Sequence, residues 1–164
     1  MRRVLVFGNS GSGKTTLAAA LRRDHGLAHL DLDTLAWQPT SPPIRRDPAD
    51  SLRDILAFTA RYDAWVIEGC YADLLALLVD GATELIFMNP GVETCERHCR
   101  SRPWEPHKYE SREAQDRSLA MLLEWVRGYA TRDDACSLAS HRRLFDSYVG
   151  VKREVGAPTG GRDG

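Results

Sequence analysis

The segment GNSGSGKT, residues 8–15, constrains the fold of this chain more than any other stretch. It matches the pattern G-x-x-x-x-G-K-[ST], and it lies between the apolar run RRVLVFG and the helix-forming run KTTLAAALRRDHG. In such a strand–loop–helix unit, backbone N–H groups and the helix N-terminus surround a phosphate. The sequence therefore predicts a phosphate-binding loop made of Gly8, Asn9, Ser10, Gly11, Ser12, Gly13, Lys14, Thr15 and Thr16.

Two side chains at the end of this loop are expected to carry its chemistry. Lys14 is predicted to reach the β- and γ-phosphates of a nucleoside triphosphate, and the Thr15 hydroxyl to coordinate Mg²⁺. ATP and Mg²⁺ are therefore the predicted cofactors. The alternative is a glycine-rich turn without a ligand, which the agreement of spacing and flanking elements disfavours.

Strands and helices alternate along the rest of the chain. Further strands are predicted at 27–33, 64–69 and 83–89, and helices at 48–62, 72–80, 90–102 and 111–130. This alternation indicates an α/β protein with the three-layer P-loop NTPase fold, in which a parallel sheet of four or five strands carries helices on both faces. A last helix is predicted at 133–148, but residues 142–146 are also compatible with a fifth strand, and the sequence does not decide between them.

The length and composition suit one domain over residues 1–155. The chain has 164 residues, of which 43% are hydrophobic, enough for a substantial core. Residues 36–48 contain four prolines and are expected to form an exposed loop. Residues 156–164 are rich in glycine and are predicted to be a disordered tail.

Charge and hydropathy exclude several classes of partner. Lysine and arginine number 22 against 23 aspartate and glutamate, a net charge of −1, so no positive field favours nucleic acid. No apolar run has the roughly 18 residues that cross a bilayer, and no signal-peptide pattern is present. We therefore expect a cytoplasmic protein that binds neither nucleic acid nor membrane.

The cysteines and one histidine are expected to be structural. The four cysteines lack the spacing of a disulfide framework, so we expect reduced thiols. Cys95, His98 and Cys99 offer three metal ligands at one helical spacing, but ordinary packing is the favoured interpretation. His141 lies between Leu138 and Phe145 in the pattern and is expected to pack rather than to catalyse.

Three acids follow or end predicted strands. Asp31 and Asp33 lie at positions i and i+2, which share one face of a strand, and Glu68 ends the next strand. An acid at such a strand end normally holds the Mg²⁺ of a P-loop enzyme or its waters. The alternatives are that one aspartate caps the following turn and that Glu68 is a solvated carboxylate.

The order of these motifs resembles that of the small P-loop kinases related to adenylate, shikimate and gluconate kinases. The resemblance covers about residues 1–130 and rests on the phosphate-binding loop, LDLD, VIEG and NPGVETCERHCRSR. VIEGCY and HLDLDTLAWQP are most similar to bacterial adenylate-kinase-related proteins of the topology modulation protein type. The resemblance implies phosphoryl transfer from ATP to a small nucleotide or another small molecule.

The resemblance also implies roles for individual residues. Asp33 would contact the acceptor hydroxyl, while Asp31 and Glu68 would face the metal held by Thr15. The resemblance places Arg97, and Arg102 or Arg100, at the nucleotide and its transferring phosphate; a solvated basic helix face is the alternative for these arginines. The short, proline-bounded segment PWEPHKY predicts a lid over about residues 101–112. We also expect Trp37, Arg45, Arg46 and Tyr71 to line the acceptor pocket, with residues 36–48 as its loop. Inward-facing Arg45 and Arg46 would indicate an anionic acceptor, and a solvated loop is the alternative.

The acceptor cannot be transferred by resemblance. Adenylate kinases carry an arginine shortly after the acid–glycine pair and shikimate kinases a glycine triplet, whereas this chain has EGCYADLL. The choice between ATP and GTP, and between monomer and homodimer, also stays open. Two rival interpretations are a regulatory ATPase that passes phosphate only to water and a nucleic-acid-binding factor, of which the near-neutral charge disfavours the second.

Overall fold

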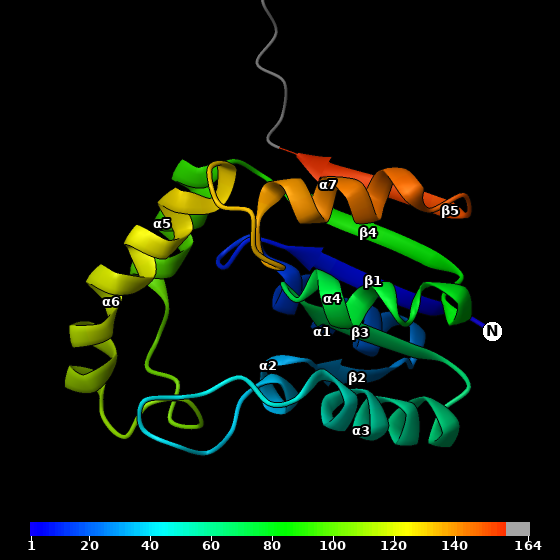
Figure 1. Ribbon diagram of the computed structural model, residues 1–164, viewed down its shortest axis with the longest axis horizontal. Coiled ribbons are helices and arrows are strands. Elements are labelled where there is room, and N and C mark those ends of the chain that lie inside the picture. Colours follow the sequence, from blue (N-terminus) through cyan, green and yellow to red (C-terminus); the bar gives the residue numbers. More distant parts are fainter. Residues whose placement is uncertain (157–164) are drawn as a thin grey trace, which may run out of the picture.

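Five parallel strands form a single sheet in the computed structural model, which describes residues 1–156 (Figure 1). The strands are β1 (Arg3–Gly8), β2 (Ala28–Asp31), β3 (Trp65–Gly69), β4 (Glu84–Asn89) and β5 (Val151–Gly156). Their order in the sheet is β2-β3-β1-β4-β5, and all pairs are parallel. The predicted α/β fold is confirmed, with five strands rather than four.

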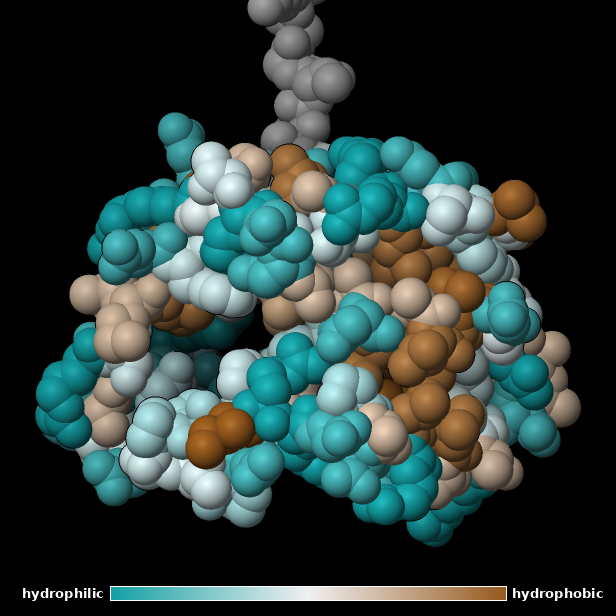
Figure 2. All heavy atoms as spheres, in the orientation of Figure 1, coloured by the Kyte–Doolittle hydropathy of each residue, from teal (hydrophilic) through white to brown (hydrophobic). Residues whose placement is uncertain are grey.

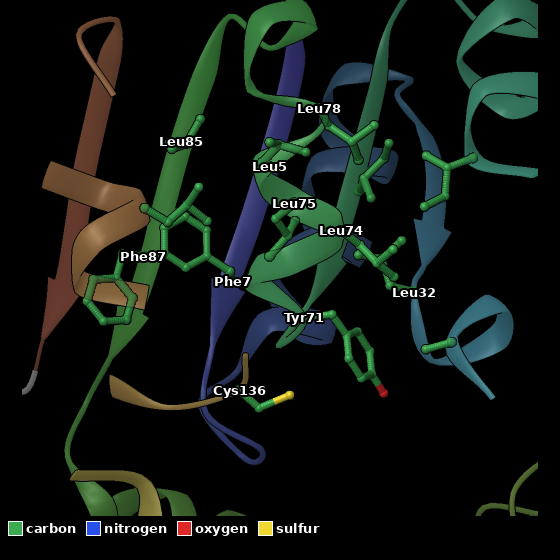
Figure 3. Packing of buried hydrophobic residues seen from close by; sticks show 14 of the residues in the cluster. Leu5, Phe7, Leu32, Tyr71, Leu74, Leu75, Leu78, Leu85, Phe87 and Cys136 are labelled. Atoms are coloured by element: carbon green, nitrogen blue, oxygen red, sulfur yellow. The ribbon is translucent and has the colours of Figure 1, made fainter. Parts of the chain in front are cut away.

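Helices cover both faces of the sheet because strand side chains alternate in direction. Val4 and Val6 of β1 face α1 (Lys14–His25), which buries Ala18 and Leu21 against them. The opposite face packs against α3 (Pro48–Arg61), α4 (Ala72–Ala76) and α7 (Leu138–Ser147). Figure 3 shows this second, larger cluster, in which the labelled residues are Leu5, Phe7, Leu32, Tyr71, Leu74, Leu75, Leu78, Leu85, Phe87 and Cys136.

Two further helices lie beyond the carboxyl ends of the strands (Figure 1). These helices, α5 (Val92–Ser101) and α6 (Arg112–Arg127), pack on each other through Cys95, Cys99, Leu123 and Val126. A hollow separates them from the part of the molecule over the sheet (Figure 2). All four cysteines are free thiols, and none of the described helices is long and apolar enough to cross a membrane.

The second strand is shorter than predicted. It ends at Asp31, and Asp33 begins the short helix α2 (Asp33–Ala36). The Asp31 carboxylate accepts the Asp33 N–H at 2.9 Å, so Asp31 caps this turn, which was one of the alternatives. Asp31 and Asp33 therefore do not share a strand face, although they remain neighbours.

The fifth strand lies beyond the region in which it was sought. Residues 142–146 belong to α7, and the strand is Val151–Gly156, whose side chains are mostly exposed. An edge strand with little buried surface lacks the apolar pattern that identifies a strand in sequence. Gly156, predicted as part of the tail, ends this strand, and residues 157–164 of that tail lie outside the described residues.

Three helical predictions need their ends corrected. The helix predicted at 72–80 is α4 followed by a 3₁₀ turn at Val79–Gly81, and the helix predicted at 111–130 is α6 followed by a 3₁₀ turn at Gly128–Ala130. The helix predicted from residue 133 begins at Leu138, because Ser137 accepts the Ser140 N–H and caps it.

His141 is packed in the core, as expected, and is held in its neutral form. Its Nδ1 accepts the Tyr129 hydroxyl at 2.7 Å, its Nε2 donates to the Cys70 carbonyl at 2.7 Å, and Phe7 and Phe87 flank the ring. Burial lowers the pKa of His141 to about 4 from 6.5.

This burial predicts a loss of stability in acid. Below pH 6.5 the unfolded chain binds a proton at His141 that the folded chain takes up only near pH 4. The free energy of unfolding should therefore fall by about 2 to 3 kcal/mol on this account between pH 7 and pH 4. Urea unfolding between pH 7 and pH 4 measures this change in the free energy of unfolding. Its pH dependence should become smaller in His141→Gln and stay unchanged in the control His25→Gln, at an exposed histidine. The same pH dependence in wild type and His141→Gln would contradict the prediction.

Candidate active site

The phosphate-binding loop between β1 and α1 is closed by its own lysine. Lys14 Nζ donates to the Asn9 carbonyl at 2.7 Å, and the Ser12 N–H donates to the same oxygen at 3.2 Å. Gly11 has a φ of +77°, and a Cβ there would collide with the carbonyl of Cys95 and the sulfur of Cys99. Only glycine therefore allows helix α5 to approach the loop this closely.

A large cavity opens in front of this loop. Its volume is about 850 Å³, and it extends from the loop across the start of α1 to the segment after α5. We call it the phosphate cavity; it is lined by Gly11, Ser12, Gly13, Lys14, Thr15, Thr16, Leu17, Ala20, Asp31, Met88, Pro90, His98, Ser101, Arg102, Pro103, Glu105, His107 and Lys108. Of the predicted loop residues, Asn9 is buried with its amide bonded to the Val126 carbonyl at 3.2 Å, and Ser10 lines a second cavity.

Two of the predicted metal-site residues, Thr15 and Asp31, line the phosphate cavity, and the third, Glu68, is buried beside Thr15. The Thr15 hydroxyl donates to Glu68 at 3.1 Å, and His29 Nε2 lies 3.1 Å from the other oxygen of the same carboxylate. Glu68 is only 2% exposed, so it is not the solvated carboxylate of the alternative interpretation. Burial, together with the negative charges of Asp33 and Glu68, raises the pKa of Asp31 to about 6 from 3.8.

This donor set fits Mg²⁺. Residues 1–156 contain no group of three or more His, Cys, Asp or Glu side chains arranged to hold a metal by themselves. Mg²⁺ does not need one, because it takes one or two protein oxygens and completes its shell with phosphate oxygens and water. A hydroxyl and two crowded carboxylates, one of them with a raised pKa, offer the negative oxygens that such an ion prefers.

The crowding of Asp31 predicts a stabilising substitution. Because the folded-state pKa lies above 3.8, ionising Asp31 costs folded-state stability as the pH rises through about 6. Asp31→Asn keeps the acceptor for the Asp33 N–H and removes the charge. At pH 8 it should raise the free energy of unfolding by about 2 kcal/mol, with no gain at pH 3.5.

Thermal or urea unfolding at the two pH values checks this prediction. Asp80→Asn, at an exposed carboxylate, is the matched control and should change stability little at either pH. Addition of Mg²⁺ with ATP should stabilise the wild type more than Asp31→Asn. A variant that is less stable than wild type at pH 8 without Mg²⁺ would contradict the account of Asp31.

Asp33 lies between the phosphate cavity and a second one. One of its oxygens accepts the Tyr71 hydroxyl at 2.5 Å, and Tyr71 in turn accepts Trp37 Nε1 at 2.8 Å. Its other oxygen lies 3.5 Å from Nζ of Lys108, which lines the phosphate cavity. Burial raises the pKa of Tyr71, so its hydroxyl stays a donor to Asp33.

The second cavity brings together three residues that the sequence predicted for the acceptor. It measures about 400 Å³, and we call it the aromatic cavity; it is lined by Ser10, Trp37, Arg45, Cys70, Tyr71, Trp125, Asp134, Ala135 and Cys136. Trp37 and Arg45 form an antiparallel bridge across the proline-rich loop, and residues 38–44 between them are exposed, as predicted. Tyr71 stands at the edge of the core with its hydroxyl directed out of the cluster (Figure 3).

The predicted arginines separate into different places. Arg102 lines the phosphate cavity. Arg97 does not: its guanidinium donates to Thr94 at 3.0 Å and lines a separate surface hollow that it shares with Arg100. Arg46 is held by Asp54 at 2.8 Å, away from both cavities.

Three residues of the site were missed in the sequence. His98 donates from Nδ1 to the Gly11 carbonyl at 2.7 Å and so ties α5 to the loop; its spacing from Cys95, Cys99 and Arg102 marks that face of the helix. Lys108 lies in the predicted lid. Burial by itself would lower the pKa of Lys108, but the carboxylates of Asp33 and Glu105 raise it above its usual value. Trp125 was not predicted as a site residue, because in the sequence it stands next to the apolar stripe of α6 and belongs to no motif.

Comparisons with known proteins bear on the fold alone. No protein-family model and no curated protein sequence matches the chain. An unliganded sugar kinase from Janibacter sp. HTCC2649 has a similar structure, with a TM-score of 0.53 at 19% identity, covering 95% of this chain and 85% of that one. The chain thus has the fold of the P-loop kinases.

Two further kinases give weaker matches. A shikimate kinase from Bacteroides thetaiotaomicron has a TM-score of 0.46 at 20% identity, covering 88% of this chain and 97% of its own. A gluconokinase from Sinorhizobium meliloti 1021 has a TM-score of 0.46 at 18% identity, covering 87% and 93%. The reaction and the acceptor have to be argued from the site.

Proposed function

We propose that the protein is a Mg²⁺-dependent kinase that transfers the γ-phosphate of ATP to the hydroxyl group of a small molecule. One observation carries the proposal: the Asp33 carboxylate contacts Lys108 of the phosphate cavity through one oxygen and Tyr71 of the aromatic cavity through the other. A carboxylate in this position can orient an alcohol and accept its proton while the phosphoryl group moves.

The residues in and beside the phosphate cavity would have different roles in phosphoryl transfer. The loop N–H groups and Lys14 bind the phosphates, and Arg102 and Lys108 lie where they can neutralise charge on the transferring group. Thr15, with Glu68 and Asp31, would hold Mg²⁺, which would supply positive charge to neutralise the phosphates. Arg97, at its separate hollow, does not enter this proposal.

The finer identity is proposed on the resemblance of the motifs. Within the small P-loop kinases, we place the chain with the adenylate-kinase-like, topology modulation protein-type group, acting in the cytoplasm as a monomer or homodimer without nucleic acid. Residues 101–112 would act as its lid, since Arg102, Glu105 and Lys108 of this segment are among the residues that line the phosphate cavity. Closure of such a segment excludes water from the reaction.

A phosphotransfer screen tests the proposal. The protein is incubated with Mg²⁺ and ATP labelled in the γ-phosphate, together with nucleosides, nucleoside monophosphates or sugar acids. A kinase should form labelled phosphate ester with one acceptor and consume ATP at least tenfold faster than without it. Steady ATP hydrolysis that no acceptor alters would favour the regulatory ATPase instead.

A further inference from the structure

Three large aromatic side chains line the aromatic cavity. Trp37, from the loop after α2, is 40% exposed, and Trp125, from α6, is 41% exposed; both line the cavity together with Tyr71. Large aromatic side chains left partly open at one cavity favour a ligand that stacks on them. Bases of different kinds stack on such aromatic side chains, because every base has a flat π-face.

The cations near this cavity are already paired. The Arg45 guanidinium lies over the rings of Trp37 and Tyr71, at 5.8 and 4.7 Å from their centroids, and donates to Asp73 at 3.1 Å. A carboxylate or phosphate of a ligand would therefore have to compete with Asp73 for this group.

The second arginine beside the cavity is also committed. Arg132 lies 3.5 Å from the centroid of the Trp125 ring and donates to Asp134 at 3.0 Å. The Nε atom of Arg45 is the exception to this pairing: it is buried without a hydrogen-bond partner among the described residues. A single N–H donor can meet a ring nitrogen or a carbonyl oxygen, but it does not make a site for an anion.

Resting on the proposed kinase function, we propose that the acceptor is an uncharged planar heteroaromatic compound that carries an alcohol, with nucleosides as the main example. Its ring stacks in the aromatic cavity between Trp37 and Trp125, and its alcohol points to Asp33 beside Tyr71. The alcohol oxygen bonds to the γ-phosphorus, the bond from that phosphorus to the oxygen of ADP breaks, and the alcohol proton passes to Asp33. The products are ADP and a phosphate monoester.

Calorimetric binding in the presence of Mg²⁺ and saturating non-hydrolysable ATP analogue tests this proposal, because the analogue fills the nucleotide site. The probes are thymidine, cytidine and pyridoxine as heteroaromatic alcohols, against gluconate, shikimate and thymidine monophosphate. At least one heteroaromatic alcohol should bind at least tenfold more tightly than each of the other three compounds. Tighter binding of thymidine or cytidine than of pyridoxine would identify the acceptor as a nucleoside. Tighter binding of pyridoxine would identify it as an alcohol on a smaller heteroaromatic ring.

Variants of the ring walls test where the probe binds. Trp125→Leu and Trp37→Leu should each weaken its binding by about tenfold, whereas Trp125→Phe, which keeps a flat ring, should weaken it less than threefold. Met121→Ala, at a residue of α6 that is 76% exposed and lines neither cavity, is the control and should bind normally. Thermal unfolding of each variant shows whether it is folded.

The contrary outcomes separate this proposal from the function on which it rests. The proposal is overturned if gluconate, shikimate or the monophosphate binds as tightly as the heteroaromatic alcohols, if none of these alcohols binds, or if folded Trp125→Leu binds them normally. Phosphorylation of a sugar acid would then leave the kinase function standing. Failure of the ATP analogue itself to bind would contradict both the proposed acceptor and the proposed kinase function.

Discussion

Replacing Lys14 by alanine is expected to lower the rate of phosphoryl transfer from ATP by at least about 100-fold, the scale seen when one preorganised charge-stabilising group is removed. Lys14 lines the phosphate cavity, and its ammonium group donates to the Asn9 carbonyl at the turn of the loop. In the proposed kinase this group would move to the β- and γ-phosphates, between which negative charge is redistributed during transfer. The rate of acceptor phosphorylation measures the effect.

Stability should change much less than activity in this variant. The Asn9 carbonyl keeps the N–H of Ser12 as a donor, so the loop retains its turn, and the midpoint of thermal unfolding should fall by only a few degrees. Arg22→Ala, at an exposed residue of the same helix, should retain normal activity. Normal turnover by folded Lys14→Ala would contradict the assignment of the loop.

Local patterns explain why so much of the fold was predictable. The phosphate-binding loop needs glycines at fixed positions next to a strand and a helix, so its sequence and conformation are tied together. The apolar runs of β1, β3 and β4 are buried on both faces, which makes them continuous in the sequence. The start of α3 was equally clear, because Asp47 caps it by accepting the Ala49 N–H at 2.8 Å before a proline at the first position.

Contacts between distant segments explain what the sequence did not reveal. Asp31 and Asp33 were predicted to share a strand face, but the cap that Asp31 forms turns the chain and separates their partners. Asp33 then meets Lys108, which lies 75 positions away in a segment without regular structure. Nothing local in either segment encodes this pairing, so only the three-dimensional fold identifies Lys108 as a residue of the site.

The aromatic cavity falls between these two cases. The sequence predicted Trp37, Arg45, Arg46 and Tyr71 as a group. The structure brings all but Arg46 together, through the bridge from Trp37 to Arg45 and the bond from Trp37 to Tyr71. The charge that Arg45 brings was open in the sequence, since an inward-facing arginine would have implied an anionic acceptor. Its pairing with Asp73 across the fold now points away from an anion.

Replacing Asp33 by asparagine is expected to lower acceptor phosphorylation by about 100- to 1,000-fold, the range of a lost general base. An asparagine keeps an oxygen for the Tyr71 hydroxyl, so the chain of bonds from Trp37 survives, but it can neither take up the alcohol proton nor balance the charge of Lys108. The affinity for the ATP analogue should change less than twofold, because Asp33 is not among the residues that line the phosphate cavity. Single-turnover transfer and equilibrium binding measure the two effects separately.

The same variant decides between the kinase and the regulatory ATPase. In a kinase, the slow transfer of phosphate to water needs no acceptor base, so Asp33→Asn should lose acceptor phosphorylation and keep its background ATP hydrolysis. The matched control is Asp63→Asn, whose exposed carboxylate precedes β3 at the opposite end of the sheet, and it should behave as wild type. An equal loss of hydrolysis and transfer would place Asp33 on the nucleotide side of the reaction, and unchanged transfer would mean that another group receives the proton.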